Sequence, residues 1–242
     1  MASGRGASRS QRTTGSTAMD DTGNNLDWTQ QVRQRPRGWY LPVKRLVDVV
    51  AATVALVLLS PILLGAWAAI KLTGGGPVLF TQTRIGMDER PFRVLKFRSM
   101  RADRTPDPKE TVPLDHPEIT RLGRLLRRTK IDELPQIFNV LLGDMSIIGP
   151  RPTLPDQVER YSEFERQRLW VRPGCTGLAQ ISGGATISWP ERIRWDVYYV
   201  HHLSAGLDLQ ILFRTPIAIL LGEKRIARHL NEADTTVPNK GS

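Results

Sequence analysis

Residues 46–70 (LVDVVAATVALVLLSPILLGAWAAI) form an apolar run with a single charged residue, Asp48, near its start. A straight helix of these 25 residues would be about 37 Å long, enough to cross the hydrocarbon core of a bilayer, which is about 30 Å thick. The run is too long and too uniformly apolar for the core helix of a soluble protein. We therefore predict that it enters a membrane, and this constrains how the rest of the chain can fold.

Two features of the run favour a re-entrant hairpin over a spanning helix. Ser60 and Pro61 lie near the middle, where a proline removes a helical hydrogen bond and bends the axis. Each half is then only about 10 to 14 residues long, which is too short to cross. Positive charge marks the cytoplasmic side of a membrane, and here it flanks both ends of the run. The flanking residues include Lys44, Arg45, Lys71 and Arg84. On the residues alone, a spanning helix remains the alternative.

The charge balance points to an anionic partner. The chain has 242 residues and a formal charge of +10, from 34 Lys and Arg against 24 Asp and Glu. This balance suits nucleic acid, anionic lipid headgroups or phosphorylated small molecules. The single cysteine, Cys175, excludes an intramolecular disulfide. The sequence has no cluster of Cys and His residues that would predict a zinc site.

The remaining pattern predicts an α+β fold that is mainly helical. Residues 78–83 and 92–97 read as a small β-hairpin, and residues 178–181 as a short strand. Helices are expected at 117–130, 156–169, 189–202 and 207–221. The basic helix at 117–130 fits either an anionic headgroup layer or a solvated face on a core-packed helix. The expected domains are a disordered basic tail (1–38), the re-entrant membrane helix (39–73), a catalytic domain (74–222) and a flexible C-terminal tail (223–242).

Two adjacent carboxylates, Asp132 and Glu133, stand just ahead of Pro135 and an apolar helical run. Proline is tolerated in the first turn of a helix, so the pair is predicted at or just before a helix N-terminus. Cations surround the pair in sequence, and together with the helix they should keep Asp132 ionised. Such a set favours chemistry on a phosphorylated substrate with a divalent metal. The alternative is a helix-capping pair without chemistry.

Five segments occur in an order that resembles a known family. They read KRLVDVV…LLSPILL, GPVLFTQTRIG…FRVLKFRSM, RTKIDELPQIFNVLLGDMSIIGPRP, VRPGCTGLAQISG and WDVYYVHHLSAGLDLQILFRT. The chain resembles the bacterial sugar transferases, and among them the monotopic phosphoglycosyl transferases, over about residues 43–216. Its length is similar to that of the minimal catalytic form of that family.

The resemblance implies transfer of a sugar 1-phosphate from a UDP-sugar to undecaprenyl phosphate, giving undecaprenyl-diphosphate-sugar and UMP. This reaction begins a bacterial exopolysaccharide or glycoconjugate at the cytoplasmic face of the inner membrane. By resemblance, Ser60 and Pro61 kink a re-entrant helix, Asp132 is the nucleophile that forms a phosphosugar-aspartate, and Glu133 helps to hold Mg²⁺. Asp132 and Glu133 are thus the expected catalytic and metal-binding pair.

Four cations are expected to contact phosphates: Lys96, Arg98, Arg127 and Arg151. Arg151 lies between two prolines that fix the backbone, and a guanidinium fork matches phosphate oxygens. Arg128 and Lys130 are expected to face lipid. The chain departs from the family at Gly184, where many relatives have an arginine thought to face the nucleotide-sugar. This departure puts the donor contacts in doubt and leaves the two carboxylates unaffected.

The expected partners are a UDP-sugar, undecaprenyl phosphate and membrane lipids, with a homodimer left open. Nucleic acid is not expected, because no helix-turn-helix, finger or RNA-binding aromatic motif accompanies the charge and the apolar run has no place in such a protein. A non-catalytic membrane-surface scaffold is the alternative, since it needs every feature except Asp132, Glu133 and Lys96. The sequence specifies neither the sugar nor the glycan pathway.

Overall fold

The computed structural model describes residues 35–36, 38–74, 76–101 and 116–221 of the chain. These residues are mainly helical, and they include two sheets of two strands each. The predicted class, mainly helical α+β, is confirmed at this level. Nearly all of the predicted N-terminal tail (1–38), the predicted C-terminal tail (223–242) and most of the loop between residues 101 and 118 lie outside the described residues.

The apolar run forms one continuous helix, α1 (Tyr40–Gly74), with Pro61 inside it. The predicted hairpin of two half-helices is therefore not confirmed. The Ser60 hydroxyl donates to the carbonyl oxygen of Val57 at 2.8 Å, and this is the carbonyl that the missing N–H of Pro61 would have bonded. Among the described residues, α1 is the one helix that is long and apolar enough to cross a membrane.

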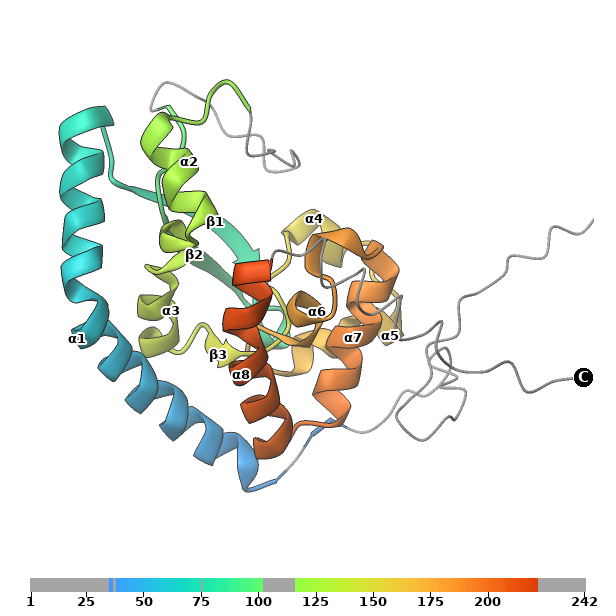
Figure 1. Cartoon of the computed structure of the whole chain (residues 1–242). Helices are drawn as coiled ribbons and strands as arrows, with labels where there is room; N and C mark the ends of the chain where they lie inside the picture. Colours follow the sequence, from blue (N-terminus) through green and yellow to red (C-terminus); the bar gives the residue numbers. More distant parts are fainter. Residues whose placement is uncertain (1–34, 37, 75, 102–115, 222–242) are drawn as a thin grey trace, which may run out of the picture. The chain divides into compact units, whose positions relative to one another are not determined.

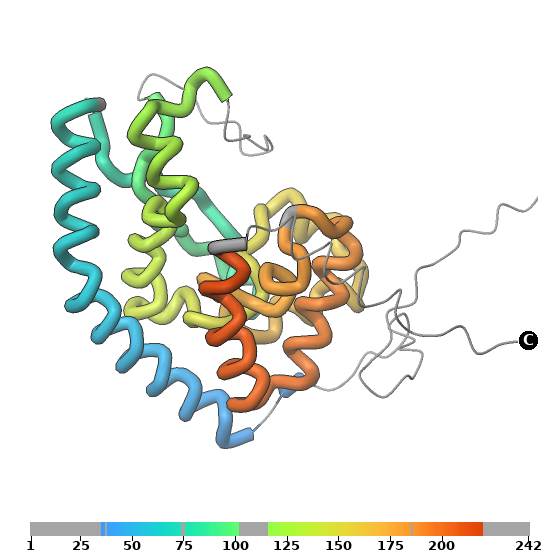
Figure 2. The backbone as a smooth tube through the Cα atoms, in the orientation of Figure 1, coloured from blue at the N-terminus to red at the C-terminus, as the bar shows by residue number. Residues whose placement is uncertain are grey.

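One side of α1 packs against the rest of the chain along most of its length (Figures 1 and 2). Ala52, in the first half, packs with Val94, Val140 and Met145. Leu63, in the second half, belongs to a cluster with Phe97. The other side of α1 exposes large apolar residues: Val43, Leu46, Val47, Val50, Val54, Val57, Leu58, Ile62, Leu64, Trp67 and Leu72. The helix thus has a packed face and a long exposed apolar face.

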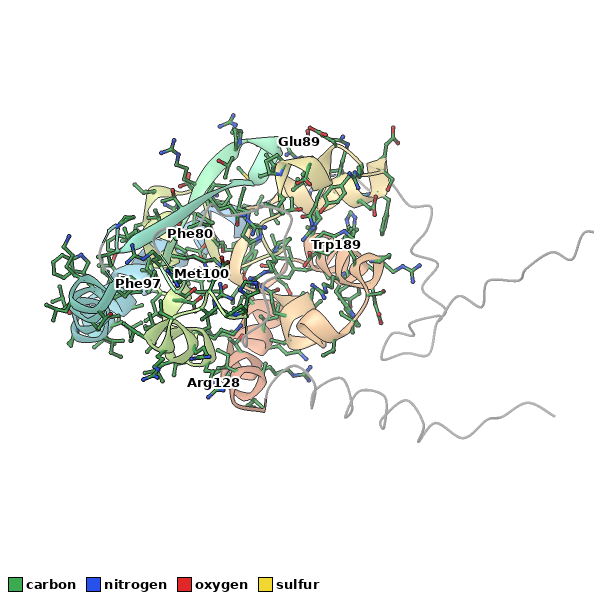
Figure 3. All side chains as sticks on the ribbon, turned by 90° about the horizontal axis from the view of Figure 1, so that it is seen from above. Phe80, Glu89, Phe97, Met100, Arg128 and Trp189 are labelled. Carbon is green, nitrogen blue, oxygen red and sulfur yellow. The ribbon has the colours of Figure 1, made fainter. Side chains whose placement is uncertain are left out.

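The predicted hairpin is confirmed as β1 (Leu79–Ile85) and β2 (Pro91–Phe97), which pair antiparallel around the turn η1 (Met87–Glu89). Figure 3 shows its two ends, with Phe97 beside α1 and Glu89 at the turn near the helices that follow residue 154. There Glu89 accepts a hydrogen bond from Arg166 at 2.6 Å. The hairpin therefore runs from α1 to the opposite part of the domain.

Helix α2 (Arg121–Arg128) follows Thr120, whose side chain caps its N-terminus by accepting from the N–H of Gly123. The turn η2 (Ile131–Glu133) then leads into α3 (Gln136–Leu142). Helix α3 ends at Gly143, whose φ of 94° is the left-handed conformation that favours glycine at this position. The predicted helix at 117–130 is thus real but shorter than expected.

Two short strands, β3 (Ser146–Ile148) and β4 (Gly174–Thr176), pair in parallel. Their backbones come so close that a Cβ on Gly174 would lie 2.1 Å from the nitrogen of Gly149. This approach needs glycine at both positions. It fixes the start of the turn that carries Arg151.

Two sequence-based predictions after residue 154 are wrong. The single helix expected at 156–169 is three short elements, α4 (Pro155–Val158), α5 (Glu163–Arg166) and η3 (Gln167–Trp170). The strand expected at 178–181 is instead a helical turn, α6 (Leu178–Ile181), followed by η4 (Gly184–Thr186).

The last two helices are α7 (Trp189–His201) and α8 (Ala205–Leu221), close to their predicted ranges. Asp208 near the start of α8 is buried and joins three elements. It accepts from Tyr40 and Lys44 of α1, at 2.6 and 2.7 Å, and from Tyr199 of α7 at 2.7 Å. These contacts fix the first turns of α1 to the helical part of the domain.

Candidate active site

Asp132 and Glu133 lie in η2, directly ahead of α3, with Pro135 at its N-cap position. Lys130, just before the turn, has a left-handed φ of 58°, which separates η2 from α2. The two carboxylates therefore precede a helix, as the position of Pro135 predicts.

Two cations from distant elements hold Glu133. The Nζ of Lys96, on β2, donates to Glu133 Oε1 at 2.6 Å. The NH2 of Arg151, in the turn after β3, donates to the same oxygen at 3.2 Å. The fold thus brings together three of the predicted site residues, which are separated by up to 55 positions (151 − 96) in the sequence.

Asp132 has a different environment. Its side chain is buried, and Oδ1 has no hydrogen-bond partner among the described residues. Buried polar atoms in folded proteins nearly always have a partner, so an orphaned carboxylate oxygen needs an explanation. A ligand that supplies positive charge or an electrophilic atom would provide one.

The two neighbouring carboxyl groups have pKa values shifted in opposite directions. Burial raises the pKa of Asp132, and the negative charge of Glu133 raises it further. The positive charges of Lys96, Arg127 and Lys130 act to lower it. Burial also acts to raise the pKa of Glu133, but Arg151 and Lys96 together hold it well below its usual range. The cations near the pair therefore act mainly on Glu133, because the direct ion pairs go to it; that Asp132 is ionised stays a prediction.

The other two predicted cations, Arg127 and Arg98, come from α2 and from the end of β2. The Nε of Arg127, on α2, donates to the hydroxyl of Ser99 at 2.8 Å, and its charge acts on Asp132. Arg98 follows β2, and its backbone N–H donates to Val78 at 2.9 Å. Phosphate contact by Arg98 and Arg127 stays a prediction.

Sequence reasoning missed two arginines that lie behind the site. Arg84 on β1 is close enough to Arg151 and Glu133 for their charges to act on its own pKa. Arg168 is buried and forms an ion pair with Asp196 at 2.5 Å. The alternation of β1 places Arg84 on the half-buried face of the strand, which is the one signal in the sequence that could have drawn attention to it.

The segment that departs from the family pattern is a glycine turn. Gly183 and Gly184 have φ values of 121° and 52°, and they connect α6 to η4. A Cβ on Gly183 would also lie 2.7 Å from the side chain of Ile187. Glycine therefore suits the backbone here, and no arginine side chain is present at position 184.

This arrangement of a long apolar helix, a buried Asp132 beside a half-buried Glu133, and converging cations agrees with the comparison to known proteins. The family model for bacterial sugar transferases matches residues 39–222, and the chain belongs to that family.

Several curated proteins are similar to it. An uncharacterised sugar transferase, EpsL, of Bacillus subtilis is 44% identical over 181 residues, which cover 75% of this chain and 89% of that protein. The UDP-N-acetylgalactosamine-undecaprenyl-phosphate N-acetylgalactosaminephosphotransferase of Aeromonas hydrophila is 42% identical over 193 residues, 77% of this chain and 46% of that protein. The UDP-glucose:undecaprenyl-phosphate glucose-1-phosphate transferase of Escherichia coli is 42% identical, over 72% of this chain and 39% of that protein. The match thus spans less than half of these two named transferases.

Proposed function

We propose that this protein transfers a sugar 1-phosphate from a UDP-sugar to undecaprenyl phosphate, giving undecaprenyl-diphosphate-sugar and UMP. Relatives whose names state such reactions support the reaction class. The observation in this chain that carries the proposal is the buried Asp132, with an unpartnered Oδ1, beside a Glu133 that Lys96 and Arg151 hold. The product begins an exopolysaccharide or another bacterial glycoconjugate.

The reaction proceeds in two displacements at one phosphorus atom. Asp132 Oδ1 attacks the β-phosphorus of the donor; the new O–P bond forms as the bond to UMP breaks. A phosphate oxygen of the lipid carrier then attacks the same phosphorus and releases Asp132. A carboxylate suits this role because its acyl phosphate is reactive enough for a weak second nucleophile. Burial of Asp132 favours it further, since a desolvated carboxylate is a stronger nucleophile than a hydrated one.

Lys96 and Arg151 bind and orient the phosphates. Both already converge on one oxygen of Glu133, so a phosphate beside Glu133 meets two fixed cations. Charge neutralisation at the transferring phosphoryl group is the main task in this chemistry. An arginine fork can bind two phosphate oxygens at once, whereas the lysine acts as a point charge.

The residues present fit Mg²⁺. Mg²⁺ is usually held by one or two carboxylates together with substrate phosphates and water. Among the described residues no group of three or more His, Cys, Asp or Glu side chains converges, which excludes an all-protein cage there but not a site of this kind. Asp132 and Glu133 would hold the ion, and it would supply positive charge to the donor phosphates.

We further propose that α1 is re-entrant and that the domain lies on the cytoplasmic face. Both halves of α1 pack against the same domain, through Ala52 in the first half and Leu63 in the second. A helix that crossed the membrane away from the domain would leave one of these faces unpacked. The exposed apolar face of α1 would contact lipid, and the lipid carrier would reach the site from there.

Purified protein in nanodiscs, with Mg²⁺, undecaprenyl phosphate and a panel of UDP-sugars, tests the proposal by release of UMP. At least one donor is expected to react, and Asp132→Asn should abolish release. Persistent turnover by Asp132→Asn would contradict the nucleophile assignment. Absence of turnover with every donor would favour a non-catalytic scaffold of the same fold.

A further inference from the structure

The turn that carries Arg151 is held at four consecutive carbonyl groups by donors outside the turn. Backbone N–H groups hold the two outer carbonyls: Gly174 donates to Pro150 at 2.8 Å, and Ile85 donates to Thr153 at 2.9 Å. Side chains hold the two inner carbonyls. Arg168 donates to the carbonyl of Arg151 itself, and Arg84 donates to the next carbonyl, that of Pro152.

Arg168 is placed for this by a buried network. Its side chain is 2% exposed. One NH group donates to the hydroxyl of Tyr161 at 2.6 Å, and the other donates both to Asp196 on α7 and, at 3.0 Å, to the carbonyl of Arg151. Removing a partner from such a network leaves a buried polar group unsatisfied, so the geometry is strongly determined.

Arg84 is fixed in a similar way from the hairpin. Its Nε and NH2 donate to Gln82 Oε1, at 3.1 and 2.6 Å, which leaves NH1 to reach the carbonyl of Pro152 at 3.3 Å. Both guanidiniums use their planar fork to hold a side chain and a backbone carbonyl at once. A lysine ammonium in the same place could not make both contacts in this geometry.

We infer that Arg84 and Arg168 are positioning residues that aim the Arg151 guanidinium at Glu133 and at the donor phosphates. They act on the backbone at and after Arg151, and prolines on both sides restrict the remaining freedom. The role given to Arg151 in this inference rests on the proposed function. The contacts that hold the turn do not depend on it. Such preorganisation matters because a displacement of about 1 Å at a substrate-positioning group can cost about 100-fold in rate.

Double-mutant cycles with Arg151→Ala test the inference. Arg84→Lys and Arg168→Lys keep the charge, so that Asp196 is not left without a cation. Each should lower kcat/KM for the reactive UDP-sugar about tenfold. The loss should fall on the same parameter, kcat or KM, that Arg151→Ala changes. In the Arg151→Ala background each should lower it less than about twofold, because the group they position is gone.

Two matched Arg→Lys controls are available, one on the strand that pairs with β1 and one in the short helix before η3. Arg93 is exposed on β2, opposite Thr83 in the hairpin register. Arg166 lies two positions before Arg168 and pairs with Glu89 near the surface. Arg93→Lys and Arg166→Lys should leave kcat/KM within about twofold of the wild type. A tenfold loss in these controls would show that neighbouring arginines matter equally, and would overturn the specific assignment.

Hydrogen exchange of a peptide covering residues 149–154 provides a readout that does not depend on activity. Exchange should be faster in Arg84→Lys and Arg168→Lys and unchanged in Arg151→Ala. If exchange is unchanged in the first two variants, or if their activity losses persist in full in the Arg151→Ala background, the inference is wrong. If the wild type releases no UMP while exchange responds as expected, the proposed function fails and the positioning of the turn stands.

Discussion

Asp132 and Glu133 show how burial and direct contact can separate two adjacent carboxyl groups. Their common neighbourhood of cations predicts, from sequence, that Asp132 is ionised. In the structure the direct ion pairs go to Glu133, while burial and the charge of Glu133 raise the pKa of Asp132. Sequence distance could not distinguish them, because Lys96 and Arg151 reach Glu133 from other elements.

Replacing Lys96 with glutamine should move the acid limb of the donor half-reaction to higher pH. The charge of Lys96 lowers the pKa of Asp132, so its loss raises that pKa further. Because the attacking group is the ionised carboxylate, the rate of the first displacement is lost as pH falls through the pKa of Asp132, and this loss then begins at higher pH. The direction of the change follows from the loss of one positive charge that acts on Asp132.

The measurement is UMP release without the lipid acceptor, from pH 5 to 8, so that the carrier phosphate does not contribute. Arg93→Gln, on the same strand and exposed, is the control and should leave the profile unmoved. An acid limb at the same pH in Lys96→Gln and the wild type would contradict the assignment of that limb to Asp132.

Asp48 is the one charged residue of the apolar run, and the structure gives the reason for it. Its side chain is 4% exposed and accepts the N–H of Ile147, in β3, at 3.0 Å. Asp48→Ala would leave that buried donor unsatisfied, at a cost of about 1–3 kcal/mol. For a protein of this size, a fall in Tm of roughly 5 °C is expected.

Asp48→Asn is the matched control, because its amide oxygen can still accept from Ile147. Thermal unfolding in the same detergent should place Asp48→Asn closer to the wild type than to Asp48→Ala. Equal losses in both variants would indicate that the charge, and not the hydrogen bond, is what α1 needs at this position.

At the scale of elements, long or strongly patterned segments could be predicted and short ones could not. The β1–β2 hairpin and α7 follow clear signals of alternation, turn residues and a proline near the helix start. Residues 178–181 are too few for periodicity to distinguish a strand from a helix. The helix expected at 156–169 ends early because Ser162 and Glu165 form a capping box that starts α5 anew.

Substitution of Gly123 tests how closely α2 packs on the backbone of Ser99. A Cβ at Gly123 would lie 1.8 Å from the carbonyl oxygen of Ser99, so α2 packs directly on that backbone. Gly123→Ala must push α2 away, at a cost of about 1–3 kcal/mol or more. The shift would also disturb the bond between Arg127 and Ser99, and activity should fall together with stability.

Gly65→Ala is the control for the same substitution in a helix. Nothing lies within 4 Å of a Cβ at Gly65, and alanine favours a helix over glycine by about 0.5–1 kcal/mol. Thermal unfolding should therefore show opposite signs for the two variants. A Gly123→Ala protein as stable and active as the wild type would contradict the close packing of α2 on Ser99.

The sequence predicted the class of protein better than it predicted the side-chain contacts between separate elements. The apolar run, the carboxylate pair and the order of the motifs point to the family, which the comparison confirms. Networks such as that of Arg168 with Asp196 and Tyr161 join residues from separate elements. No pattern within one sequence marks such pairs, because a buried arginine and a surface arginine read alike until the fold is known.

The proposed re-entrant arrangement predicts which side of the membrane each end of α1 occupies. Contacts of α1 with the domain begin at Tyr40 and continue to Ile70. The start of α1 should therefore lie on the same side of the membrane as the domain. Single cysteines at Trp39, which is 76% exposed, and at Glu163, which is exposed on α5, can report this in a Cys175→Ala background.

A membrane-impermeant maleimide should label both cysteines in inverted vesicles and neither in intact spheroplasts. A third cysteine at Val57, exposed on the apolar face of α1, should resist the reagent in both preparations because lipid would cover it. Labelling at position 39 in spheroplasts, with position 163 labelled only in inverted vesicles, would show that α1 spans the membrane. In that case the contacts of Tyr40 and Lys44 with Asp208 could not exist in the bilayer, because Asp208 belongs to the domain on the other side.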